Sequence, residues 1–516
     1  MNLKINNTYL ELIYIFLLGS ISSFSLPPYS FWFLNFITFS LLIIFLLKKK
    51  KSSLKEFFIY GYIFGFGYFV FSLYWIPLSL SYDESFKSLI PLVTILIPSF
   101  LSLFYAISFC VFKKFSNSKF VFSNILLFSL VLGFFEYLRG NILSGFPWNL
   151  FSYSLSENLT FIQINSLIGV YAFNTILITI FSIPSILYLN RDKINLFGFL
   201  IIFITSISFY YYGELRIKNF NNLNSTALPL EIKIISTNVP IERFYSSLDS
   251  EAVILKLIRL SDPKLDKKTL FIWPESVIPN INLKSLNEEY NYLFGNFFGK
   301  DHFIILGIND KEIINGKQIY YNSLSIIDKN IDVIYKYYKN NLVPFGEFLP
   351  LENLLSKIGF KSLTNNYHSY SEGSQRKIFN LSLNNEIRIL PLICYEIIYS
   401  GTFSKNNNYN FIVNISEDGW FGNSIGPYQH FAHTIFRSIE YGKYTLRSAN
   451  NGISAIIDPT GKVIKKIKIN DEGALVLKKI KNINKTAFSE FGNKIYFLVI
   501  LLYIFLIFSF KRFENE

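Results

Sequence analysis

Three side chains with complementary chemistry each stand at or near the end of an apolar stretch of the chain. Glu275 follows Leu-Phe-Ile-Trp-Pro, Lys339 follows a Tyr-rich stretch, and Cys394 follows Ile-Arg-Ile-Leu-Pro-Leu-Ile. A thiol with a pKa of ~8.5 is only partly ionised at neutral pH and needs a nearby base. Glu275 suits that role in an apolar pocket, and an ammonium at Lys339 would favour the thiolate and stabilise a tetrahedral oxyanion. The three residues together predict nucleophilic catalysis by Cys394.

Each of these residues taken alone has a simpler interpretation. A Glu after a strand is usually a solvated turn residue, a single Lys says little, and a Cys after an apolar run is usually a small buried side chain. The combination favours a site, with the backbone N–H of Tyr395 as a second oxyanion donor. The chain has two cysteines, and its four histidines show no metal-ligand spacing, so we expect no disulfide, no metal and no cofactor.

The elements that must position these residues are short buried strands alternating with helices. We expect strands over residues 232–236, 269–273, 303–307, 321–327, 387–393, 411–415, 453–458 and 463–468, and helices over residues 250–260 and 427–444. This alternation predicts a layered α/β domain over residues 214–494. Reactive side chains are usually displayed at strand ends in such sheets, which matches the places of Glu275 and Cys394.

The remainder of the chain is far more apolar. Charged residues make up only 16% of the whole sequence, against ~25% in soluble domains. Eight apolar runs are long enough, or nearly so, to span a membrane, at residues 10–25, 31–47, 57–78, 89–112, 121–137, 161–189, 196–212 and 495–510. We therefore expect a membrane domain of seven transmembrane helices over residues 1–213, and an eighth helix with a short tail over residues 495–516.

The positive charges indicate how these helices are oriented. The net charge is +13, and with a cytoplasmic N-terminus the inner segments carry 13 Lys and Arg residues, whereas the outer short loops carry only Lys87 and Arg139. Cytoplasmic loops are enriched in Lys and Arg, so this asymmetry predicts that residues 214–494 lie outside the cytoplasm. The basic character then belongs to topology, which argues against a nucleic-acid partner. Arg139, at an outer helix end, would either bind lipid phosphate or snorkel to the interface.

The local sequences around the three residues resemble the nitrilase (carbon–nitrogen hydrolase) superfamily. The matching blocks are Trp-Pro-Glu-Ser at 273–276, Leu-Val-Pro-Phe-Gly-Glu at 342–347 after Lys339, and Ile-Cys-Tyr-Glu at 393–396. With the apolar runs, the block Gly-Phe-Pro-Trp at 145–148 and further blocks at 414–422, 427–430 and 447–452, the whole chain resembles the apolipoprotein N-acyltransferase family. The resemblance implies a multi-span α-helical membrane domain with eight transmembrane helices, plus an extracytoplasmic nitrilase-like α-β-β-α sandwich.

The resemblance also implies roles for individual residues. The catalytic residues would be the general base Glu275, the oxyanion-stabilising Lys339 and the acylated nucleophile Cys394. Four further positions match residues that support activity, namely Glu347, Tyr395, Glu396 and Trp273. Of these, Glu347 would orient the site and Trp273 would line it. A backbone-bonded loop carboxylate for Glu347, and plain packing for Tyr395 and Trp273, stay open as alternatives.

The implied reaction is two acyl transfers. A phospholipid acyl chain moves to Cys394 as a thioester, and then to the α-amino group of the S-diacylglyceryl cysteine of an apolipoprotein, the last step of lipoprotein maturation. The resemblance implies a bacterial inner-membrane protein with its catalytic domain in the periplasm, and we expect a monomer. Two alternatives are a membrane-tethered nitrilase-type amidase that releases the acyl group to water, and a non-enzymatic transporter with a degenerate soluble domain.

Overall fold

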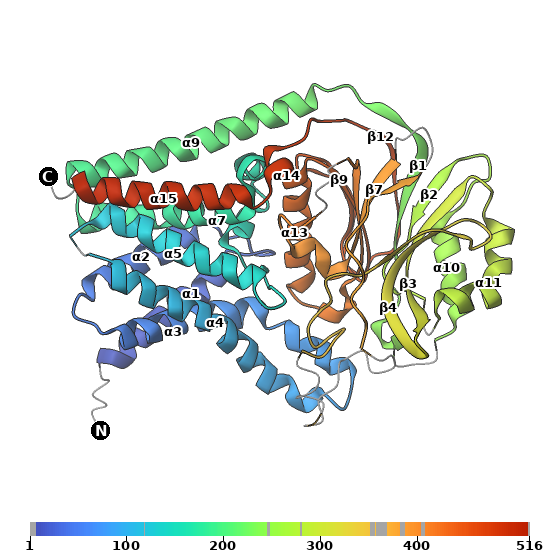
Figure 1. Ribbon diagram of the computed structural model, residues 1–516, viewed down its shortest axis with the longest axis horizontal. Coiled ribbons are helices and arrows are strands. Elements are labelled where there is room, and N and C mark those ends of the chain that lie inside the picture. The colour runs from blue at the N-terminus through green and yellow to red at the C-terminus, as the bar shows by residue number, and fades with distance from the viewer. Residues whose placement is uncertain are drawn as a thin grey trace.

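The computed structural model describes residues 7–117, 119–244, 248–278, 281–350, 357, 369–381, 387–403 and 408–513. A bundle of long helices occupies one end of the molecule, and two β-sheets with their flanking helices occupy the other (Figure 1). The described residues of 7–221 and 494–513 are called the helical part below, and those of 226–480 are called the sandwich.

The helical part is formed by the apolar runs of the sequence. Its helices are α1 (Asn7–Ser23), α2 (Leu34–Lys48), α3 (Leu54–Leu73), α4 (Ile90–Phe115), α5 (Val121–Asn141), α6 (Leu159–Ile162), α7 (Asn165–Ser182), α8 (Ile186–Leu189), α9 (Lys193–Asn221) and α15 (Lys494–Phe513). Among the described residues, six helical segments are long and apolar enough to cross a membrane, and α1 and α2 are shorter apolar helices.

The predicted run 161–189 is not one continuous helix. It is divided into α6, α7 and α8, and Gly169 within α7 has a φ of 74°. A Cβ at this glycine would lie 2.1 Å from the ring of Phe488, so no other residue fits here without displacing that ring. Phe488 belongs to α14 (Ala487–Phe491), the short helix before α15, and the break in α7 therefore lets α14 pack closely against it.

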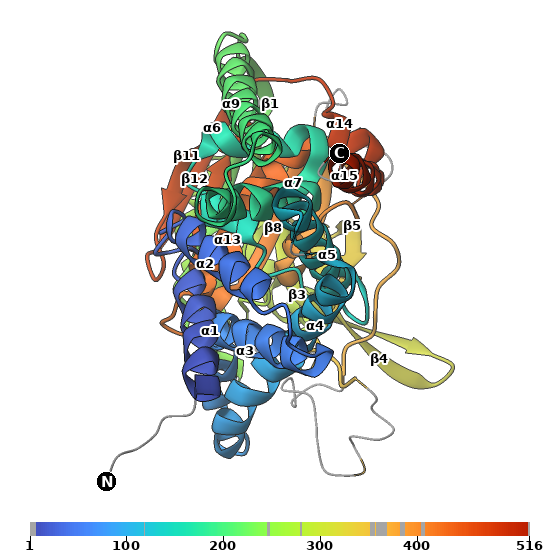
Figure 2. The ribbon, with the colours of Figure 1, turned by 90° about the vertical axis from the view of Figure 1, so that its left-hand side faces the viewer.

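The basic turns of the helical part lie together at one end of the bundle. The Lys113 ammonium donates to the carbonyl oxygens of Lys49 and Lys50, which joins the turn after α2 to the end of α4. Lys511, near the end of α15, donates to the carbonyl oxygen of Phe115. The opposite end of the bundle faces the sandwich, which lies behind the helices in Figure 2.

Arg139 differs from both sequence-based expectations. Its side chain is buried, and its guanidinium forms an ion pair with Glu136, three residues earlier in α5, and donates to the carbonyl oxygen of Phe146. It also lies over the ring of Phe69. The prediction that Arg139 binds lipid phosphate or snorkels is wrong, because Glu136 supplies its counter-charge inside the bundle.

Within the described residues, the strands of the sandwich form two six-stranded sheets. The first has the order β12-β1-β2-β3-β4-β5 and the second has the order β11-β10-β9-β8-β7-β6. The bounds are β1 (Thr226–Ser236), β2 (Thr269–Ile272), β3 (His302–Ile314), β4 (Lys317–Ile327), β5 (Val333–Tyr338), β6 (Phe379–Leu381), β7 (Ile387–Ile393), β8 (Phe411–Glu417), β9 (Tyr444–Asn450), β10 (Ser454–Ile457), β11 (Val463–Ile467) and β12 (Gly473–Ile480). Each sheet contains three adjacent strands that run parallel to one another, β1-β2-β3 in the first sheet and β7-β8-β9 in the second.

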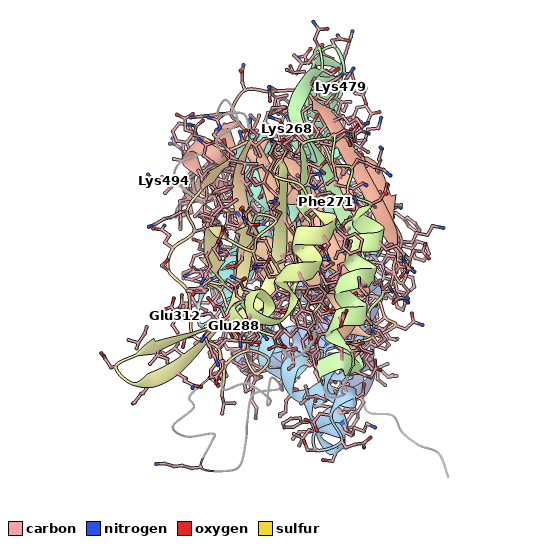
Figure 3. The ribbon with its side chains drawn as sticks, turned by 90° about the vertical axis from the view of Figure 1, so that its right-hand side faces the viewer. Lys268, Phe271, Glu288, Glu312, Lys479 and Lys494 are labelled. Atoms are coloured by element: carbon pink, nitrogen blue, oxygen red, sulfur yellow. The ribbon has the colours of Figure 1, made fainter. Side chains whose placement is uncertain are left out.

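Helices cover the outer face of each sheet. α10 (Ser250–Ser261) and α11 (Leu283–Phe297) lie over the first sheet, in front of it in Figure 3. α13 (Gly426–Tyr441) lies between the second sheet and the helical part (Figure 1). One apolar core fills the space between the sheets and another lies beneath α10 and α11, whereas the core around α13 is continuous with that of the helical part. The layers are therefore α-β-β-α.

The structure contains all the predicted strands and adds several elements that were not predicted, namely β5, β6, β9, β12 and α11. The predicted helix 427–444 is too long by three residues. It ends at Tyr441, because Gly442 takes a left-handed conformation with a φ of 62°, and β9 begins at Tyr444.

Candidate active site

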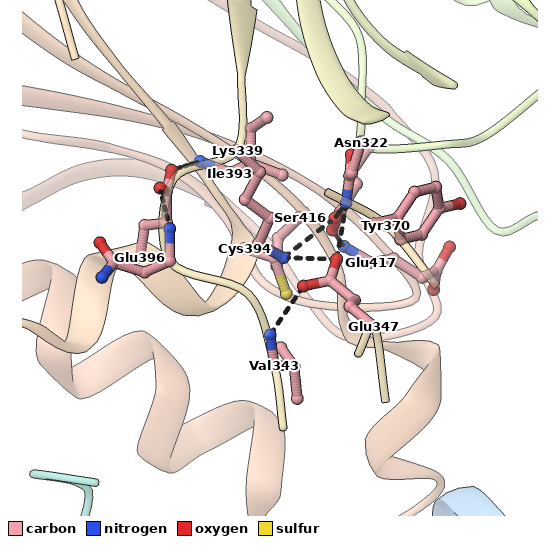
Figure 4. A network of polar contacts seen from close by, with 12 residues as sticks. Asn322, Lys339, Val343, Glu347, Tyr370, Ile393, Cys394, Glu396, Ser416 and Glu417 are labelled. Carbon is pink, nitrogen blue, oxygen red and sulfur yellow. Dashed lines mark hydrogen bonds and ion pairs between the residues drawn. The ribbon is translucent and has the colours of Figure 1, made fainter. Parts of the chain in front are cut away.

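The three sequence-predicted residues meet where strands from both sheets end. Glu275 follows β2, Lys339 follows β5 and Cys394 follows β7. β2 and β5 belong to the first sheet and β7 to the second, so the site lies between the facing sheets. Figure 4 shows the ammonium of Lys339 beside the sulfur of Cys394, and each group shifts the pKa of the other. These three residues are called the cluster below.

Both carboxylate oxygens of Glu275 are fixed by hydrogen bonds. Oε1 accepts from Nδ2 of Asn322 at 2.8 Å, and Oε2 accepts from the backbone N–H of Glu417 at 2.8 Å. Burial raises the pKa of Glu275, and the Lys339 ammonium at 3.6 Å opposes this rise without cancelling it. The pKa therefore lies above its usual value, which suits a group that must accept a thiol proton.

The backbone at Glu275 depends on a glycine of the neighbouring strand. A Cβ on Gly307, in β3, would lie 2.4 Å from the Cα of Glu275. The backbone N–H of Ser276, whose φ is 43°, donates to the Gly307 carbonyl at 3.0 Å. Only glycine lets β3 come this close, so Gly307 determines where Glu275 lies.

The Lys339 ammonium lies between two carboxylates in the protein interior. Its Nζ is 2.9 Å from Oε1 of Glu347 and 3.6 Å from Oε1 of Glu275, and only 1% of the residue is exposed. Burial alone would lower the pKa of this group, but the two carboxylates outweigh burial and raise the pKa above its usual value. Lys339 is therefore positively charged at physiological pH.

Cys394 occupies a strained turn between β7 and the 3₁₀ helix η7 (Cys394–Ile398). Its φ of 47° lies in the left-handed region, which residues other than glycine seldom adopt. Its carbonyl oxygen lies 3.3 Å from Nδ2 of Asn414 and 3.3 Å from Nε2 of His430. Burial and the nearby Glu275 raise the pKa of the thiol more than Lys339 lowers it. The resting group is a neutral thiol, so it needs a proton acceptor to become a nucleophile.

Glu347 lies inside the site. Its Oε1 accepts from Nζ of Lys339 at 2.9 Å and from Nδ2 of Asn322 at 2.8 Å, and its Oε2 accepts from the backbone N–H of Val343 at 2.8 Å. The alternative of a loop carboxylate bonded to backbone describes only one of these contacts. Glu347 is the nearer of the two counter-ions of the ammonium.

Glu396 is fully buried and links two segments that form the site. Its Oε2 accepts from the backbone N–H of Ile393 at 2.9 Å, and its Oε1 accepts from the backbone N–H groups of Asn340 and Asn341. Burial would raise the pKa of Glu396, but Arg376 at 3.0 Å and the hydrogen bonds hold it below its usual value. One carboxylate thus joins the residue before the cysteine to the residues after the lysine.

Two other residues that the sequence singled out make their contacts outside the cluster. The Tyr395 hydroxyl donates to the carbonyl oxygen of Gly145, in the helical part, at 3.0 Å. The indole of Trp273 is buried beneath α11, where it donates to Oγ of Ser261 at 2.9 Å and packs against Phe294. The ring of Trp273 therefore belongs to the core, which is the packing alternative rather than a lining of the site.

Three buried residues that were not predicted, Asp418, His430 and Arg447, form a polar network next to the backbone of Cys394. Asp418 accepts two hydrogen bonds from Nη2 of Arg447, at 2.9 and 2.8 Å, and its Oδ1 lies 3.0 Å from Nδ1 of His430. Burial would raise the pKa of Asp418, but Arg447 and His430 hold it well below its usual range. The only sequence signal was that these residues fall within the matching blocks.

Among the described residues, no group of three or more His, Cys, Asp or Glu side chains is arranged to hold a metal ion.

The site lies directly against the helical part. Gln429, in the first turn of α13, accepts through Oε1 from the indole N–H of Trp75 at 3.1 Å and from that of Trp148 at 2.8 Å. The ring of Trp148 also stacks on His430, with 5.3 Å between the ring centroids. Side chains after α3 and after α5 therefore hold the helix that contacts the Cys394 carbonyl.

The fold and the site define a class of protein. The family model described as carbon-nitrogen hydrolase matches residues 269–481, which contain the whole cluster. The family model described as the apolipoprotein N-acyltransferase N-terminal domain matches residues 18–183, in the helical part. The chain thus joins a carbon–nitrogen hydrolase sandwich to several long apolar helices.

Relatives of nearly the whole chain narrow this class. An apolipoprotein N-acyltransferase from Rhodopseudomonas palustris is 33% identical over 89% of this chain and 87% of its own length. Another, from Rickettsia prowazekii, is 32% identical over 97% of both chains. The chain belongs to the apolipoprotein N-acyltransferase family. Among solved structures, Nit3 from Saccharomyces cerevisiae, a member of branch 10 of the nitrilase superfamily, is 14% identical over 49% of this chain and 90% of its own, with a TM-score of 0.35.

Proposed function

We propose that this enzyme moves a fatty acyl chain from a membrane phospholipid, through a thioester on Cys394, to the N-terminal amino group of the S-diacylglyceryl cysteine of an apolipoprotein. The observation that carries the proposal is the charged Lys339 ammonium beside the Cys394 thiol, with Glu275 at 3.6 Å from the ammonium. In this proposal Glu275, Lys339 and Cys394 are catalytic, and they are supported by Glu347, Tyr395 and Glu396.

The first transfer acylates the enzyme. Glu275 removes the thiol proton, and the thiolate of Cys394 attacks the ester carbonyl carbon of the phospholipid. The tetrahedral oxyanion that forms is stabilised by the Lys339 ammonium and by the backbone N–H of Tyr395. When the ester C–O bond breaks, Glu275 returns its proton to the leaving oxygen of the lysophospholipid, and the Cys394 thioester remains.

The second transfer uses the same groups in reverse order. The apolipoprotein amine attacks the thioester carbonyl carbon, and Glu275 accepts a proton from the amine. The second oxyanion is stabilised as the first was, and its collapse expels the Cys394 thiolate and leaves an amide. Glu275 then returns the proton to the thiolate. Donor and acceptor are both lipid-anchored, and moving their chains into water would cost ~0.8 kcal/mol per CH₂ group, so a site beside the membrane suits both.

The same proposal includes the placement of the chain in the membrane. We infer eight transmembrane helices in a bacterial inner membrane, with residues 1–213 as the membrane domain, residues 214–494 as the periplasmic catalytic domain, and residues 495–516 as the last helix and a cytoplasmic tail. Support comes from the basic turns, which gather at the end of the bundle opposite the sandwich. α1 and α2 are counted as spans because they share the apolar core of the bundle. We propose a monomer without cofactor or nucleic-acid partner.

The amidase alternative is not favoured. An amidase and an acyltransferase of this class would form the same acyl-enzyme, and they would differ in the acceptor that discharges it. The relatives that match the chain over both parts are named as N-acyltransferases, and the N-terminal family model matches the helical part as well.

The test is the mass of the intact protein after exposure to phospholipid without an acceptor. Wild type should gain one acyl group that neutral hydroxylamine releases, with lysophospholipid as the co-product. Cys394→Ala should show no adduct, and Cys394→Ser almost none, because a hydroxyl is far harder to ionise than a thiol. Cys110→Ala, which changes the other cysteine, should form the adduct as wild type does.

Two outcomes would contradict the proposal. A wild-type enzyme that acylates an apolipoprotein but never shows the adduct, even after rapid quenching, would remove Cys394 from the role of nucleophile. Adduct that discharges as free fatty acid when an apolipoprotein is added, with no N-acylated product, would favour the amidase.

A further inference from the structure

The side-chain amide of Asn322 joins the two acidic groups on either side of Lys339. Asn322 lies in β4 and is buried, and its Nδ2 donates to Oε1 of Glu275 and to Oε1 of Glu347, at 2.8 Å in each case. Its backbone carbonyl accepts from the N–H of Lys339 at 2.9 Å. One residue thus contacts both carboxylates and the backbone of the lysine whose ammonium lies between them (Figure 4).

The chemistry of the two carboxylates determines which end of the Asn322 amide faces them. Nδ2 carries two N–H groups, one for each carboxylate, whereas Oδ1 carries none. The reversed amide would place an oxygen against two buried carboxylate oxygens and leave both without this donor. Two acceptors at 2.8 Å therefore hold the amide in one orientation.

The Asn322 amide also reduces the electrostatic repulsion between the two buried carboxylates. Glu275 and Glu347 share a single ammonium, so the three groups together carry one net negative charge in a buried place. The two N–H donors of Asn322 offset the repulsion between the carboxylates without adding a positive charge that would compete with Lys339 for the oxyanion.

We propose that Asn322 is a positioning residue that keeps Glu275 ionised and directed at the Cys394 thiol, an inference that rests on the proposed function, in which Glu275 is the base. The donor acts on Glu275 in the same direction as Lys339 does, since both favour the carboxylate over the protonated acid. Its loss should raise the pKa of Glu275 further, so that a smaller fraction of the base is ionised at neutral pH and activity returns as the pH rises.

The experiment is the pH dependence of acyl-enzyme formation by the full-length protein in mixed micelles with phospholipid. Asn322→Leu keeps the volume and removes the donor, and Asn322→Asp keeps the shape and adds a third carboxyl group. Each should move the acid limb of the rate profile upward by about one pH unit. The rate at neutral pH should fall by up to about 10-fold, and part of it should return at alkaline pH.

Asn309 offers a matched control. It lies opposite Asn322 in β3 and is also buried, but its Oδ1 accepts from the hydroxyl of Tyr370 rather than facing a carboxylate of the cluster. Asn309→Leu, which removes this amide without adding a charge, should therefore keep the acid limb of the wild type, whatever it does to thermal stability.

Three results would overturn the inference. They also show whether the inference about Asn322 fails alone or together with the proposed function. If both Asn322 variants keep the wild-type profile while Glu275→Gln forms no adduct, the base stands and Asn322 does not position it. A rate lowered equally at every pH, with an unmoved limb and a lowered melting temperature, would mean that Asn322 has only a structural role. If Glu275→Gln forms the adduct at the wild-type rate, the proposed base fails and the inference about Asn322 fails with it.

Discussion

The Lys339 ammonium is closer to Glu347, at 2.9 Å, than to Glu275, at 3.6 Å. The two carboxylates therefore have different tasks available to them. Glu347 binds the ammonium directly and is itself tied to the backbone of Val343, so it holds the ammonium in place. Glu275 keeps a looser contact with the same charge, which leaves it able to gain and lose a proton next to Cys394.

At the residue scale, we expect Glu347→Gln to slow the acylation of Cys394 about 10- to 100-fold, because the variant loses the negative charge that holds the ammonium. The protein should still accumulate in the membrane, since glutamine has the same size and its oxygen still accepts from Val343. The time course of intact-protein mass with phospholipid measures the rate. Glu288→Gln, on the exposed surface of α11, should match wild type. If Glu347→Gln also matches wild type, Glu347 is only a loop residue.

At the scale of elements, the sequence predicted the strands that form apolar runs, including the edge strand β11. It missed the edge strands β5, β6 and β12, and also the interior strand β9, which is buried but rich in Thr, Arg, Ser and Asn. β2 and β7 are almost wholly buried, so they appear as continuous apolar runs. β5 is an edge strand in which most residues are exposed or half-buried, and its Tyr and Lys residues gave no strand pattern. Lys339 was therefore predicted from the chemistry of the residue and the block that follows it, not from its element.

The role of Asn322 in the site could not be predicted from the sequence. Its contacts depend on the register of β4 against β5, in which Ser323 lies opposite Tyr338, so that Asn322 comes beside Lys339. No spacing along the chain reports such a cross-strand neighbour. Trp273 shows the opposite error, since the family resemblance implied that its ring lines the site. β2 ends at Ile272, and the indole turns instead to the core beneath α11.

The close approach of β3 to Glu275 predicts that a larger residue at position 307 will disturb both the fold and the site. Gly307→Ala should destabilise the protein by about 1–3 kcal/mol and lower the acylation rate, because its Cβ meets a backbone atom, which cannot rotate aside. Thermal unfolding and the acylation time course measure the two effects. Gly295→Ala in α11 is the control, since a Cβ there meets nothing within 4 Å and alanine favours a helix by ~1 kcal/mol. An unchanged Gly307→Ala enzyme would show that this contact does not position Glu275.

At the scale of the whole molecule, the sandwich and the helical part behave as one packed unit. Phe436 and Ile439 of α13 belong to the same apolar core as the bundle. Nε2 of Gln163, before α7, donates to the carbonyl oxygen of Thr460 in the sandwich at 2.8 Å. Because these contacts are buried, the distance from the bundle to the Cys394 turn is set by packing rather than by the length of a linker. The orientation of the bundle in the membrane then decides on which side the chemistry takes place.

The positive charges of the helical part predict how the bundle is oriented in the membrane. The basic turns after α2 and α4 and the end of α15 are joined by the contacts of Lys113 and Lys511, at the end of the bundle away from the sandwich. Since cytoplasmic turns are enriched in Lys and Arg, reporters fused near Lys51, Lys114 and Lys193 should be cytoplasmic, and one fused near Asn222, after α9, should be exported. Paired fusions to alkaline phosphatase, active only when exported, and to a fluorescent protein that matures only in the cytoplasm, measure each position twice. A cytoplasmic signal at Asn222 would contradict the eight-span count and the periplasmic site together, because an odd number of helices before Asn222 is what carries the sandwich across the membrane.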